Sequence, residues 1–358
     1  MNKICFFVGN LNNAGGTERV SSVIASELHQ RGYQVHMLSL QCGDNPFFDL
    51  SDGIQISQLF TTAGSGMRRF PLAIVKLRRY LKNNQIDILI DVESMLAIYA
   101  LPAVAGLKVH HICWEHFNYN VDLGKISRRL ARKLAARFAD DVVTLTERDK
   151  ELWHTNTTCK ANITAISNPV TISLPTEIKP YKQKLFLAVG RLTSQKGFDL
   201  LLQAWSQVAP LYPDWRLRIV GDGEDKAMLE QLRRKLSIEA STELVPKTDN
   251  IAAHYQEAAF FVMSSRFEGL PLVLIEAQAY GLPIVSFNCD TGPAEIIKHG
   301  ETGWLCEDGN VLELSDKISY AVNCFYIKNS YHALSMSSTE NVKHFSVASV
   351  IDKWLRLL

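Results

Sequence analysis

The sequence lacks the short patterns that often assign a chain of this size to a function. It contains no D-x-D tripeptide, no G-x-x-x-x-G-K-[ST] phosphate loop and no G-x-G-x-x-G dinucleotide fingerprint. Its seven cysteines form no C-x-x-C pair, which argues against a zinc ribbon or a disulfide framework and favours a reducing cytosol. The longest apolar stretch, residues 95–107, is interrupted by Pro102 and Gly106, whereas spanning a bilayer takes roughly 20 apolar residues. The first apolar run ends at Gly9, too early for a signal peptide, so we expect a cytoplasmic chain with no transmembrane helix.

The composition is that of a large globular protein. With 358 residues, of which 47% are apolar, the chain is long enough for two hydrophobic cores, and we expect two α/β domains of similar size. A net charge of +1 and a charged content of 21% disfavour a nucleic-acid-binding protein. Residues 1–165 hold 19 Lys and Arg against 15 Asp and Glu, whereas the remainder holds 19 against 22. The basic excess therefore belongs to the first domain.

Strand and helix patterns alternate along the chain in two series. In the first, apolar runs predict strands at 4–8, 35–40, 86–91, 109–113 and 142–146, with helices at 17–31, 66–83, 125–138 and 147–154. In the second, they predict strands at 185–189, 216–220 and 260–264, with helices at 198–208, 224–236 and 272–279. Three prolines at 169, 175 and 180 indicate a linker. We predict domains 1–167 and 184–342, a linker at 168–183, a polar loop at 335–341 and a last helix in 343–358.

Several residues at strand ends of the first domain are candidates for ligand contacts. Gly15 and Gly16 follow the first strand, where a glycine pair lets a ligand approach the backbone, although a simple turn explains it equally well. His110, His111, Cys113 and His116 contain metal-binding side chains, but alternation along a strand points them to opposite faces, so we favour packed histidines. His116 differs, because it follows a strand at the edge where α/β sheets hold ligands.

Two segments of the first domain are basic and amphipathic. Residues 66–83 hold six Lys and Arg among apolar residues at helical spacing, and residues 125–138 repeat that composition. A solvated helix face explains either segment alone. Two such segments in one domain indicate attraction to an anionic membrane surface.

Arg191 and Lys196 lie five residues apart in one loop between a predicted strand and a predicted helix. Two cations that open toward a helix N-terminus can neutralise a diphosphate, because the exposed amides and the helix dipole there also attract anions. The alternative is a pair of solvated loop charges. The loop is therefore a candidate nucleotide site.

Glu268 and Glu276 lie eight residues apart around the start of the predicted helix 272–279. A carboxylate among Leu, Val, Ile and Ala is costly to bury without hydrogen-bond donors, and a pair of ribose hydroxyls would supply them to Glu276. A diphosphate at the helix N-terminus would then place the transferable group near Glu268. The alternative is a capping carboxylate with a salt-bridged helix glutamate.

The run Phe267-Glu268-Gly269-Leu270-Pro271, followed by Glu276-Ala277, resembles the E-x7-E signature of GT4-type retaining glycosyltransferases. The resemblance extends over almost the whole chain, from the Gly15-Gly16 loop through the G-R-L…K-G element of residues 190–197. It implies the GT-B fold, an α/β architecture in which two Rossmann-like, doubly wound domains face a central cleft. It also implies that the last helix crosses back to the first domain.

The resemblance assigns roles to these residues. It implies that Arg191 and Lys196 bind the nucleotide diphosphate, that Glu276 binds the ribose, and that Glu268, with Gly269 and Leu270, lies beside the donor sugar. In the first domain, it implies that the Gly15-Gly16 loop faces the donor phosphate and sugar and that His116 contacts the donor sugar or the acceptor. The expected catalytic set is Glu268, His116, Arg191 and Lys196.

The expected function is retaining transfer of a hexose or N-acetylhexosamine from a nucleotide sugar, expected to be a UDP-sugar. The expected acceptor is a lipid-linked or growing surface glycan (O-antigen, capsule or exopolysaccharide) at the cytoplasmic face of an anionic inner membrane. Because Arg191 and Lys196 can stabilise the leaving diphosphate, we expect no metal and no other cofactor. Two alternatives stay open: a nucleotide-sugar epimerase of GT-B fold, and a non-catalytic, membrane-associated protein that binds nucleotide sugars.

Overall fold

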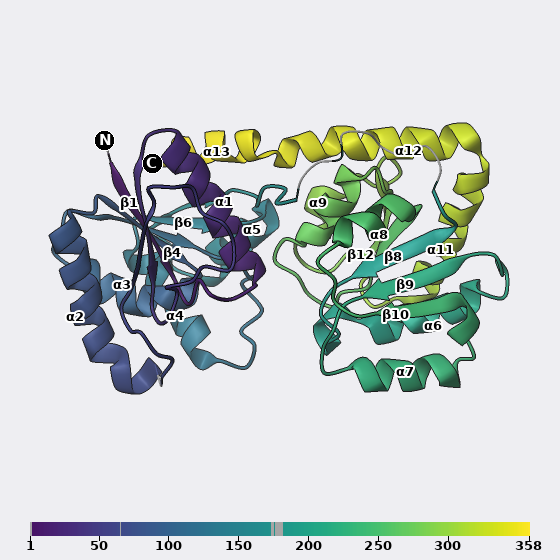
Figure 1. The fold of residues 1–358 in the computed structure, drawn as a ribbon, viewed down its shortest axis with the longest axis horizontal. Helices are drawn as coiled ribbons and strands as arrows, with labels where there is room; N and C mark the ends of the chain where they lie inside the picture. The colour runs from purple at the N-terminus through teal and green to yellow at the C-terminus, as the bar shows by residue number, and fades with distance from the viewer. Residues whose placement is uncertain (1, 65, 173–174, 176–181) are drawn as a thin grey trace. The chain divides into compact units, whose positions relative to one another are not determined.

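The computed structural model of the protein describes residues 2–64, 66–172, 175 and 182–358 (Figure 1). The chain forms two compact units, residues 1–171 with 346–358 and residues 172–345. The predicted linker 168–183 includes residues 173–174 and 176–181, which lie outside the described part of the chain. Each unit is a parallel α/β structure with its own sheet and core.

The first unit contains a seven-stranded parallel sheet of order β3-β2-β1-β4-β5-β6-β7. From β1 the chain moves outward to β2 and β3, then returns to the other side of β1 with β4. The switch point of this doubly wound sheet therefore lies between β1 and β4, where such folds hold ligands beyond the strand ends. The strands are β1 Lys3–Val8, β2 Gln34–Ser39, β3 Gln55–Gln58, β4 Ile88–Val92, β5 His110–Trp114, β6 Asp141–Thr144 and β7 Asn162–Ala165.

Helices cover both faces of the first sheet. Cys5, Phe7 and Leu89 share a core with α2 and α3, and Cys113 shares one with α4. Because side chains alternate along a strand, Trp114 points to the opposite face, where its ring packs against Trp354 of α13. The helices are α1 Gly16–Gln30, α2 Gly66–Asn84, α3 Ala97–Val104, α4 Ile126–Phe138, α5 Glu147–Asn156 and α13 Val347–Leu355.

The second unit repeats this plan with six parallel strands of order β10-β9-β8-β11-β12-β13. Its switch point lies between β8 and β11, which are neighbours in the sheet. Along the chain these two strands are separated by 70 residues, which contain β9 and β10. The strands are β8 Leu185–Val189, β9 Arg216–Val220, β10 Thr242–Val245, β11 Phe260–Met263, β12 Ile284–Phe287 and β13 Gly303–Cys306.

Alternation again divides the core of the second unit. Phe186 and Phe260 pack with α6 and α11 on one face, whereas Phe261 contacts Tyr255 of α8 on the other. The helices are α6 Phe198–Val208, α7 Lys226–Lys235, α8 Ile251–Glu257, α9 Leu272–Ala279, α10 Pro293–Ile296, α11 Val311–Tyr326 and α12 Lys328–Asn341.

The polar loop predicted at 335–341 is wrong, because these residues form the end of α12. Asn341 donates hydrogen bonds from Nδ2 to the side chain of Gln278 and to the carbonyl of Ile296, both at 2.8 Å. The hydroxyl of Ser338 lies 3.5 Å from the carbonyl oxygen of Thr302. These polar residues therefore satisfy buried groups, which their polarity alone did not reveal.

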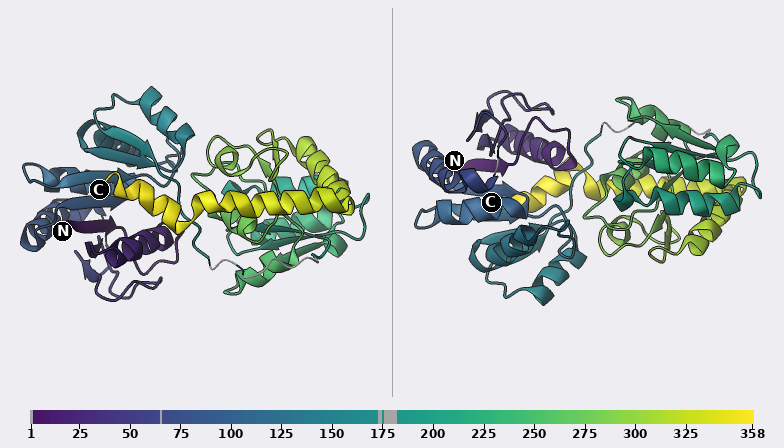
Figure 2. Two further views of the ribbon diagram at one scale, coloured as in Figure 1. Left: turned by 90° about the horizontal axis from the view of Figure 1, so that it is seen from above. Right: turned by 90° about the horizontal axis from the view of Figure 1, so that it is seen from below.

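The C-terminal helix α13 belongs to the first unit (Figure 2). The indole of Trp354 is fully buried, and its ring centroid lies 4.8 Å from that of Trp114. Ser346 caps the helix by accepting a hydrogen bond from the amide of Ser349. The last residues of the sequence thus complete a core that begins with the first strand.

Candidate functional site

Two loops meet at the switch point of the second sheet. The first follows β8 and ends in a 3₁₀ turn at Ser194–Lys196, and the second joins β11 to α9. Between turn and helix, Gly197 adopts a φ of 61°, and a Cβ there would lie 2.1 Å from the carbonyl oxygen of Ser264. Only glycine permits this close approach of the two loops.

Hydrogen bonds join the two loops. The amide of Arg266 donates to the carbonyl of Gln195 at 2.8 Å, and the side chain of Gln195 donates to the carbonyl of Phe267 at 3.1 Å. The hydroxyl of Ser264 donates to the carbonyl of Lys196 at 3.0 Å. The guanidinium of Arg266 adds a two-pronged ion pair with Asp199 of α6, a geometry that fixes orientation as well as distance.

This arrangement brings Lys196 and Glu268 together. Lys196 Nζ lies 2.6 Å from Glu268 Oε1, and the two side chains are only 16% and 8% exposed. The hydroxyl of Thr291 donates to the backbone carbonyl of Glu268 and so fixes the loop from its other side. A lysine and a glutamate predicted separately from two motifs are thus one ion pair.

Arg191 lies on the same loop as Lys196 and is exposed. No hydrogen bond or ion pair of its guanidinium is present within residues 182–358. One cation of the predicted pair is therefore engaged with a carboxylate, and the other remains open to an incoming anion.

The predicted buried helix 272–279 is α9, with the same bounds. No side chain caps its first turn, so the amides there are available to an anion. Gly269 and Leu270 lead into it, and the backbone of Gly269 packs closely against Gly292, whose φ of 100° suits glycine. The start of α9 thus has the uncapped first turn on which the predicted anion site depends, and anion binding there stays a prediction.

Glu276 lies in the middle of α9 and is 5% exposed. Tyr255 of α8 donates a hydrogen bond from its hydroxyl to Glu276 Oε2 at 2.9 Å, and its ring stacks on that of Tyr280. No pattern in the sequence pointed to Tyr255, because it lies 21 residues away on another helix. The buried carboxylate of Glu276 therefore has a hydroxyl donor within the protein, the hydroxyl of Tyr255.

In the first unit, Gly15 is the N-cap of α1 and Gly16 its first residue. A Cβ at Gly15 would lie 2.2 Å from the carboxylate of Glu18, the acidic residue of the first turn. The glycine pair therefore leaves room for the side chain of Glu18 beside the helix start. Residues 15 and 16 lie at the carboxyl end of β1, next to the switch point.

His116 follows β5 and packs its ring on that of Trp114, with centroids 4.5 Å apart. Burial lowers the pKa of the His116 imidazole to about 4, which the nearby Glu115 carboxylate only partly opposes. His116 is therefore neutral near pH 7. Its Nε2 is buried and has no hydrogen-bond partner in the described part of the chain, so the ring can still bind one polar group.

Three carboxylates of the first unit that the sequence did not single out contact basic side chains or a histidine. Glu115 is fully buried, lies 2.7 Å from Arg132 Nε and accepts a hydrogen bond from Ser94. Burial alone would raise the pKa of Glu115, but Arg132 and the surrounding donors lower it below its usual value. Asp91 pairs with His111 at 2.7 Å. Glu93 pairs with Arg128 Nη2 at 2.6 Å.

These pairs correct the prediction that the basic residues of 125–138 form one membrane-facing surface. Arg128 and Arg132 are 4% and 1% exposed, and their guanidinium groups pair with the partly buried Glu93 and the fully buried Glu115. Helical spacing puts them beside the buried Ala131 and Ala135, on the inner side of α4. Arg129, Lys133 and Arg137 remain on the exposed side.

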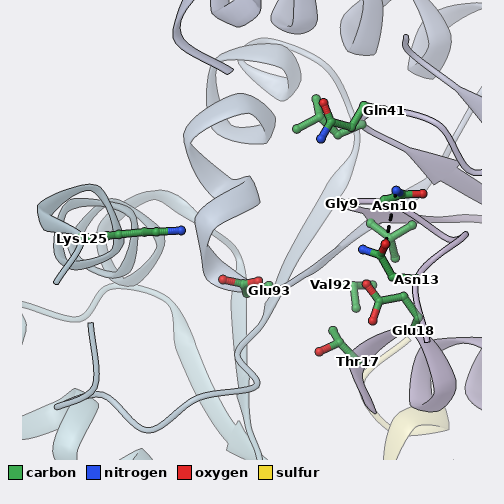
Figure 3. A pocket seen from close by; sticks show the side chains of 11 residues that line it. Gly9, Asn10, Asn13, Thr17, Glu18, Gln41, Val92, Glu93 and Lys125 are labelled. Carbon is green, nitrogen blue, oxygen red and sulfur yellow. Dashed lines mark hydrogen bonds between the residues drawn. The ribbon is translucent and has the colours of Figure 1, made fainter. Parts of the chain in front are cut away.

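A pocket of about 590 Å³ lies at the switch point of the first sheet, beyond the ends of β1 and β4 (Figure 3). Asn10, Asn13, Thr17, Glu18, Glu93 and Lys125 supply most of its polar lining. None of these residues is among the predicted site residues, although each lies after a strand or near the start of a helix at the predicted ligand edge.

Two of the three histidines considered as metal ligands, His110 and His111, contact aspartates. His111 faces Asp91, and His110 Nε2 lies 2.7 Å from Asp141. Within the described residues, no group of three or more His, Cys, Asp or Glu side chains is arranged to hold an ion. The same residues include no helix that is both long and apolar enough to cross a bilayer.

Known families match both units. The family described as Glycosyltransferase Family 4 matches residues 14–174, and the one described as Glycosyl transferases group 1 matches residues 173–336. An uncharacterized glycosyltransferase of Haemophilus influenzae is 37% identical over the full length of both chains. The amylovoran biosynthesis glycosyltransferase AmsD of Erwinia amylovora is 35% identical over 83% of this chain and 84% of its own.

Solved structures match the whole chain as well. The lipopolysaccharide outer core galactosyltransferase WaaB has a TM-score of 0.80 and 22% identity, covering 99% of this chain and 98% of its own. Anabaena HepE, solved in complex with UDP and glucose, has a TM-score of 0.79 and 17% identity, with coverage of 99% and 98%. At these identities the likeness establishes the fold. Together with the relatives of higher identity, it makes the chain a member of the GT4-type glycosyltransferases, with the two-domain α/β GT-B fold.

Proposed function

We propose that this glycosyltransferase moves a hexose or N-acetylhexosamine from a UDP-sugar onto a lipid-linked or growing surface glycan, with retention of anomeric configuration and without a metal. The observation that carries this proposal is the cluster of Lys196, Arg191 and the uncapped start of α9 at one switch point. HepE binds UDP, WaaB acts on lipopolysaccharide and AmsD in amylovoran biosynthesis, which supports the choice of donor and of acceptor class.

The cluster suits departure of a diphosphate from an anomeric carbon. Negative charge grows on the leaving oxygen as the bond breaks, and donors fixed in advance lower the barrier most. Lys196 is fixed by Glu268, and its loop is fixed by Gln195 and Arg266. Lys196 and the α9 amides would then supply the positive charge that a divalent ion supplies in other enzymes, while Glu268 orients the sugar.

The test is a screen of nucleotide sugars with and without EDTA, with NMR of the product. The proposal expects transfer or slow donor hydrolysis that survives EDTA and a product with the anomeric configuration of the donor. Free nucleotide with an altered sugar, formed without any acceptor, would indicate an epimerase. Binding without turnover of any donor would indicate a non-catalytic binder. Activity silenced by EDTA and restored by Mg²⁺ or Mn²⁺ would overturn the metal-independent mechanism.

We also propose that the first unit contacts the cytoplasmic face of an anionic membrane through α4 and α2. On α4, the exposed Arg129, Lys133 and Arg137 alternate with Ile126 and Leu130, which are 81% and 53% exposed. Arg129 also pairs with Asp122 at the start of the helix, and its side chain stays 70% exposed. Exposed apolar residues beside cations are typical of helices that lie in a membrane interface.

The outer face of α2 has a similar composition. Leu72 and Val75 are 51% and 53% exposed, beside the exposed Arg79 and Lys82. Other cations of this helix bind the protein itself: Lys76 donates to the carbonyl of Leu59, and Arg78 donates to the carbonyls of Ala103 and Ala105. The cations left on the outer face are those available to lipid.

Vesicle flotation tests the membrane contact. Changing Arg129, Lys133 and Arg137 together to Gln should release the protein from phosphatidylglycerol vesicles, because each surface cation contributes about 1 kcal/mol of attraction to anionic lipid. The matched control changes three cations of α7 in the second unit, Lys226, Arg234 and Lys235. Equal loss in both variants, or binding that ignores salt, would refute a specific electrostatic surface.

A further inference from the structure

The short helix α8 of the second unit depends on tertiary contacts for its position. It has seven residues, Ile251–Glu257, and no side chain caps its first turn. An isolated helix of this length is unstable in water, so contacts with the rest of the fold have to hold it. Among its residues Tyr255 alone is buried, and the Tyr255 hydroxyl donates to Glu276 Oε2 at 2.9 Å. The contacts that hold α8 therefore also bear on the orientation of the Glu276 carboxylate.

Arg218 of β9 holds α8 from the sheet, with a side chain that is 15% exposed. Its Nη1 lies 2.6 Å from Glu257 Oε2 and 3.2 Å from His254 Nδ1, and both partners belong to α8. These two partners lie on either side of Tyr255 in the sequence. Its Nε lies 2.7 Å from Glu243 Oε2, on the neighbouring strand β10, which fixes the guanidinium itself. Arg218 thus contacts α8 at two points that flank Tyr255.

The contact between Arg218 and His254 requires a neutral imidazole. Burial, and then the charge of Arg218, lower the pKa of His254, and Glu257 and Glu243 only partly oppose this. His254 is therefore neutral near pH 7, and its Nδ1 can accept a hydrogen bond from the guanidinium. The two carboxylates are 41% and 44% exposed, so solvent weakens their ion pairs. The cluster therefore serves geometry more than stability, because a planar guanidinium directs several donors at fixed angles.

A second set of contacts holds the carboxyl end of α8. Lys182 donates from Nζ to the carbonyl of Gln256 at 3.0 Å, and the amide of Gln183 donates to the carbonyl of Glu257 at 2.8 Å. The contact of Arg218 with His254 lies about one turn earlier on the same helix. The two sets together restrain both the end of α8 and the turn that leads to Tyr255.

We propose that Arg218 is a positioning residue for the nucleotide: it fixes α8 so that Tyr255 presents the Glu276 carboxylate to the ribose of the donor. This inference rests on the proposed UDP-sugar donor and on the predicted contact of Glu276 with the ribose. Arg218 acts through Tyr255 and Glu276 and not by contact with the ligand. It lies outside the E-x7-E and G-R-L…K-G motifs, so neither motif marks it in the sequence.

Calorimetry of the full chain with UDP and with its 2′-deoxy analogue tests this role. Arg218→Gln should weaken UDP binding about fivefold, the scale of one ordinary hydrogen bond, and should weaken binding of the analogue less. The matched control is Arg216→Gln, two residues earlier on β9 and on the same face of the sheet. Arg216 is exposed and donates to the carbonyl of Ala240 rather than to α8, so this variant should bind UDP as the wild type does.

Two further variants separate positioning from folding. In a Tyr255→Phe background, Arg218→Gln should weaken UDP binding by less than about twofold, because residues that act through one contact are not additive. Glu257→Gln removes a partner that is 41% exposed and leaves the guanidinium in place. It should show the same preference for affecting UDP over the analogue, with a smaller loss, even if Arg218→Gln folds poorly.

The outcomes are distinct from those that test the proposed function. If Arg218→Gln and Glu257→Gln bind UDP like the wild type, or if the loss in Arg218→Gln adds in full to that of Tyr255→Phe, the positioning role is wrong and the transferase proposal stands. Equal losses for UDP and the analogue would place the effect on the fold of the unit and would also overturn the role. If the losses follow the expected pattern but no nucleotide sugar is turned over, the positioning role stands and the proposed function fails.

Discussion

The switch points of the two sheets carry different side chains. Between β8 and β11, Lys196 and Glu268 form an ion pair on two hydrogen-bonded loops, with Arg191 exposed nearby. Between β1 and β4, an open pocket is lined mainly by amides and carboxylates. At the first site Glu93 is paired with Arg128, and Glu18 shares the pocket with Lys125, so the charges balance. At the second site Lys196 is paired with Glu268, and Arg191 is a cation without a partner within residues 182–358.

The comparison teaches that the net charge of a domain and the charge of its site have different causes. The excess cations of the first half lie largely on α2 and α4, on outer faces or in ion pairs with Glu93 and Glu115. The charge of each site is set by a few residues at strand ends. Single substitutions at the strand ends or in the buried core can therefore separate the two causes.

The largest expected effect is the loss of turnover when the cation Lys196 of the second unit is removed. Lys196→Ala should lower kcat at least about 10²-fold, the usual scale for removing one donor aimed at developing charge. Donor binding should change less, because this charge grows mainly as the bond breaks. Steady-state kinetics measure both, and Lys235→Ala on the exposed end of α7 is the control.

Lys196→Ala also leaves Glu268 buried without its partner, which by itself destabilises a fold. The double variant Lys196→Ala with Glu268→Gln removes that unpaired charge. If turnover recovered in the double variant, loss of the fold and not of the cation would explain the defect, and the leaving-group role would be refuted.

The next largest expected effect is a loss of UDP affinity when Glu276, the predicted ribose ligand, is changed. Glu276→Gln should cost about 1.5–3 kcal/mol of UDP affinity by calorimetry, because a charged acceptor is lost from a buried site. Tyr255→Phe should cost less, about 0.5–1.5 kcal/mol, since Tyr255 acts only by holding Glu276 Oε2.

The 2′-deoxy analogue of UDP sharpens this prediction. Both variants should lose less affinity for the analogue than for UDP if the Glu276 carboxylate meets the ribose hydroxyl. Equal losses for the two ligands, in variants that melt like the wild type, would point to a structural role for the pair.

The buried carboxyl of Asp149, on α5 of the first unit, should make the stability of the fold depend on pH. Burial, and then the charge of Glu115, raise the pKa of Asp149 from 3.8 to about 7. The folded state therefore holds a proton that the unfolded state releases, and this stability, fully present below pH 4, is lost as the pH rises to about 7.

Asp149→Asn keeps the oxygen that accepts a hydrogen bond from the Tyr119 amide and removes the titration. Its melting temperature relative to the wild type should increase from pH 4 to pH 8, by an equivalent of a few kcal/mol at about 1.4 kcal/mol per pKa unit. The exposed Glu151→Gln is the control. A difference that does not vary with pH would contradict the assignment.

The smallest effect tests the pairing of Lys196 with Glu268. Glu268→Gln frees Lys196 and removes a negative charge near the expected diphosphate, so UDP should bind severalfold more tightly while transfer slows. Calorimetry and single-turnover rates give the two numbers. Weaker UDP binding would mean that Glu268 orients Lys196 rather than competing with the nucleotide for it.

The regular part of the second unit was predictable. The strands 185–189 and 216–220 and the helices 198–208 and 272–279 match β8, β9, α6 and α9 residue for residue. Their apolar residues recur at strand or helix spacing, and a glycine or proline follows each segment within two residues, which leaves little choice of bounds. By contrast, β3 at Gln55–Gln58 has no buried residue and no apolar run, so the sequence carries no signal for it.

The candidate site was predictable where its residues are close in sequence. Glu268 and Glu276 share one helix start, and Arg191 and Lys196 share one loop. Tyr255 and Arg128 were not predictable, because their partners Glu276 and Glu93 lie 21 and 35 residues away on other elements. An arginine at helical spacing looks the same in sequence whether it faces solvent or a buried glutamate, and only the tertiary contact decides.

The position of Trp354 in the first core bears on how the chain acquires its structure during synthesis. When the ribosome has produced residues 1–171, the face of the sheet that carries Trp114 still lacks its covering indole, which is encoded more than 180 codons later. The second unit is translated in the meantime and has no such dependence on a later segment. We therefore expect the later-made unit to mature first, with the first-made unit completed only at the end of translation.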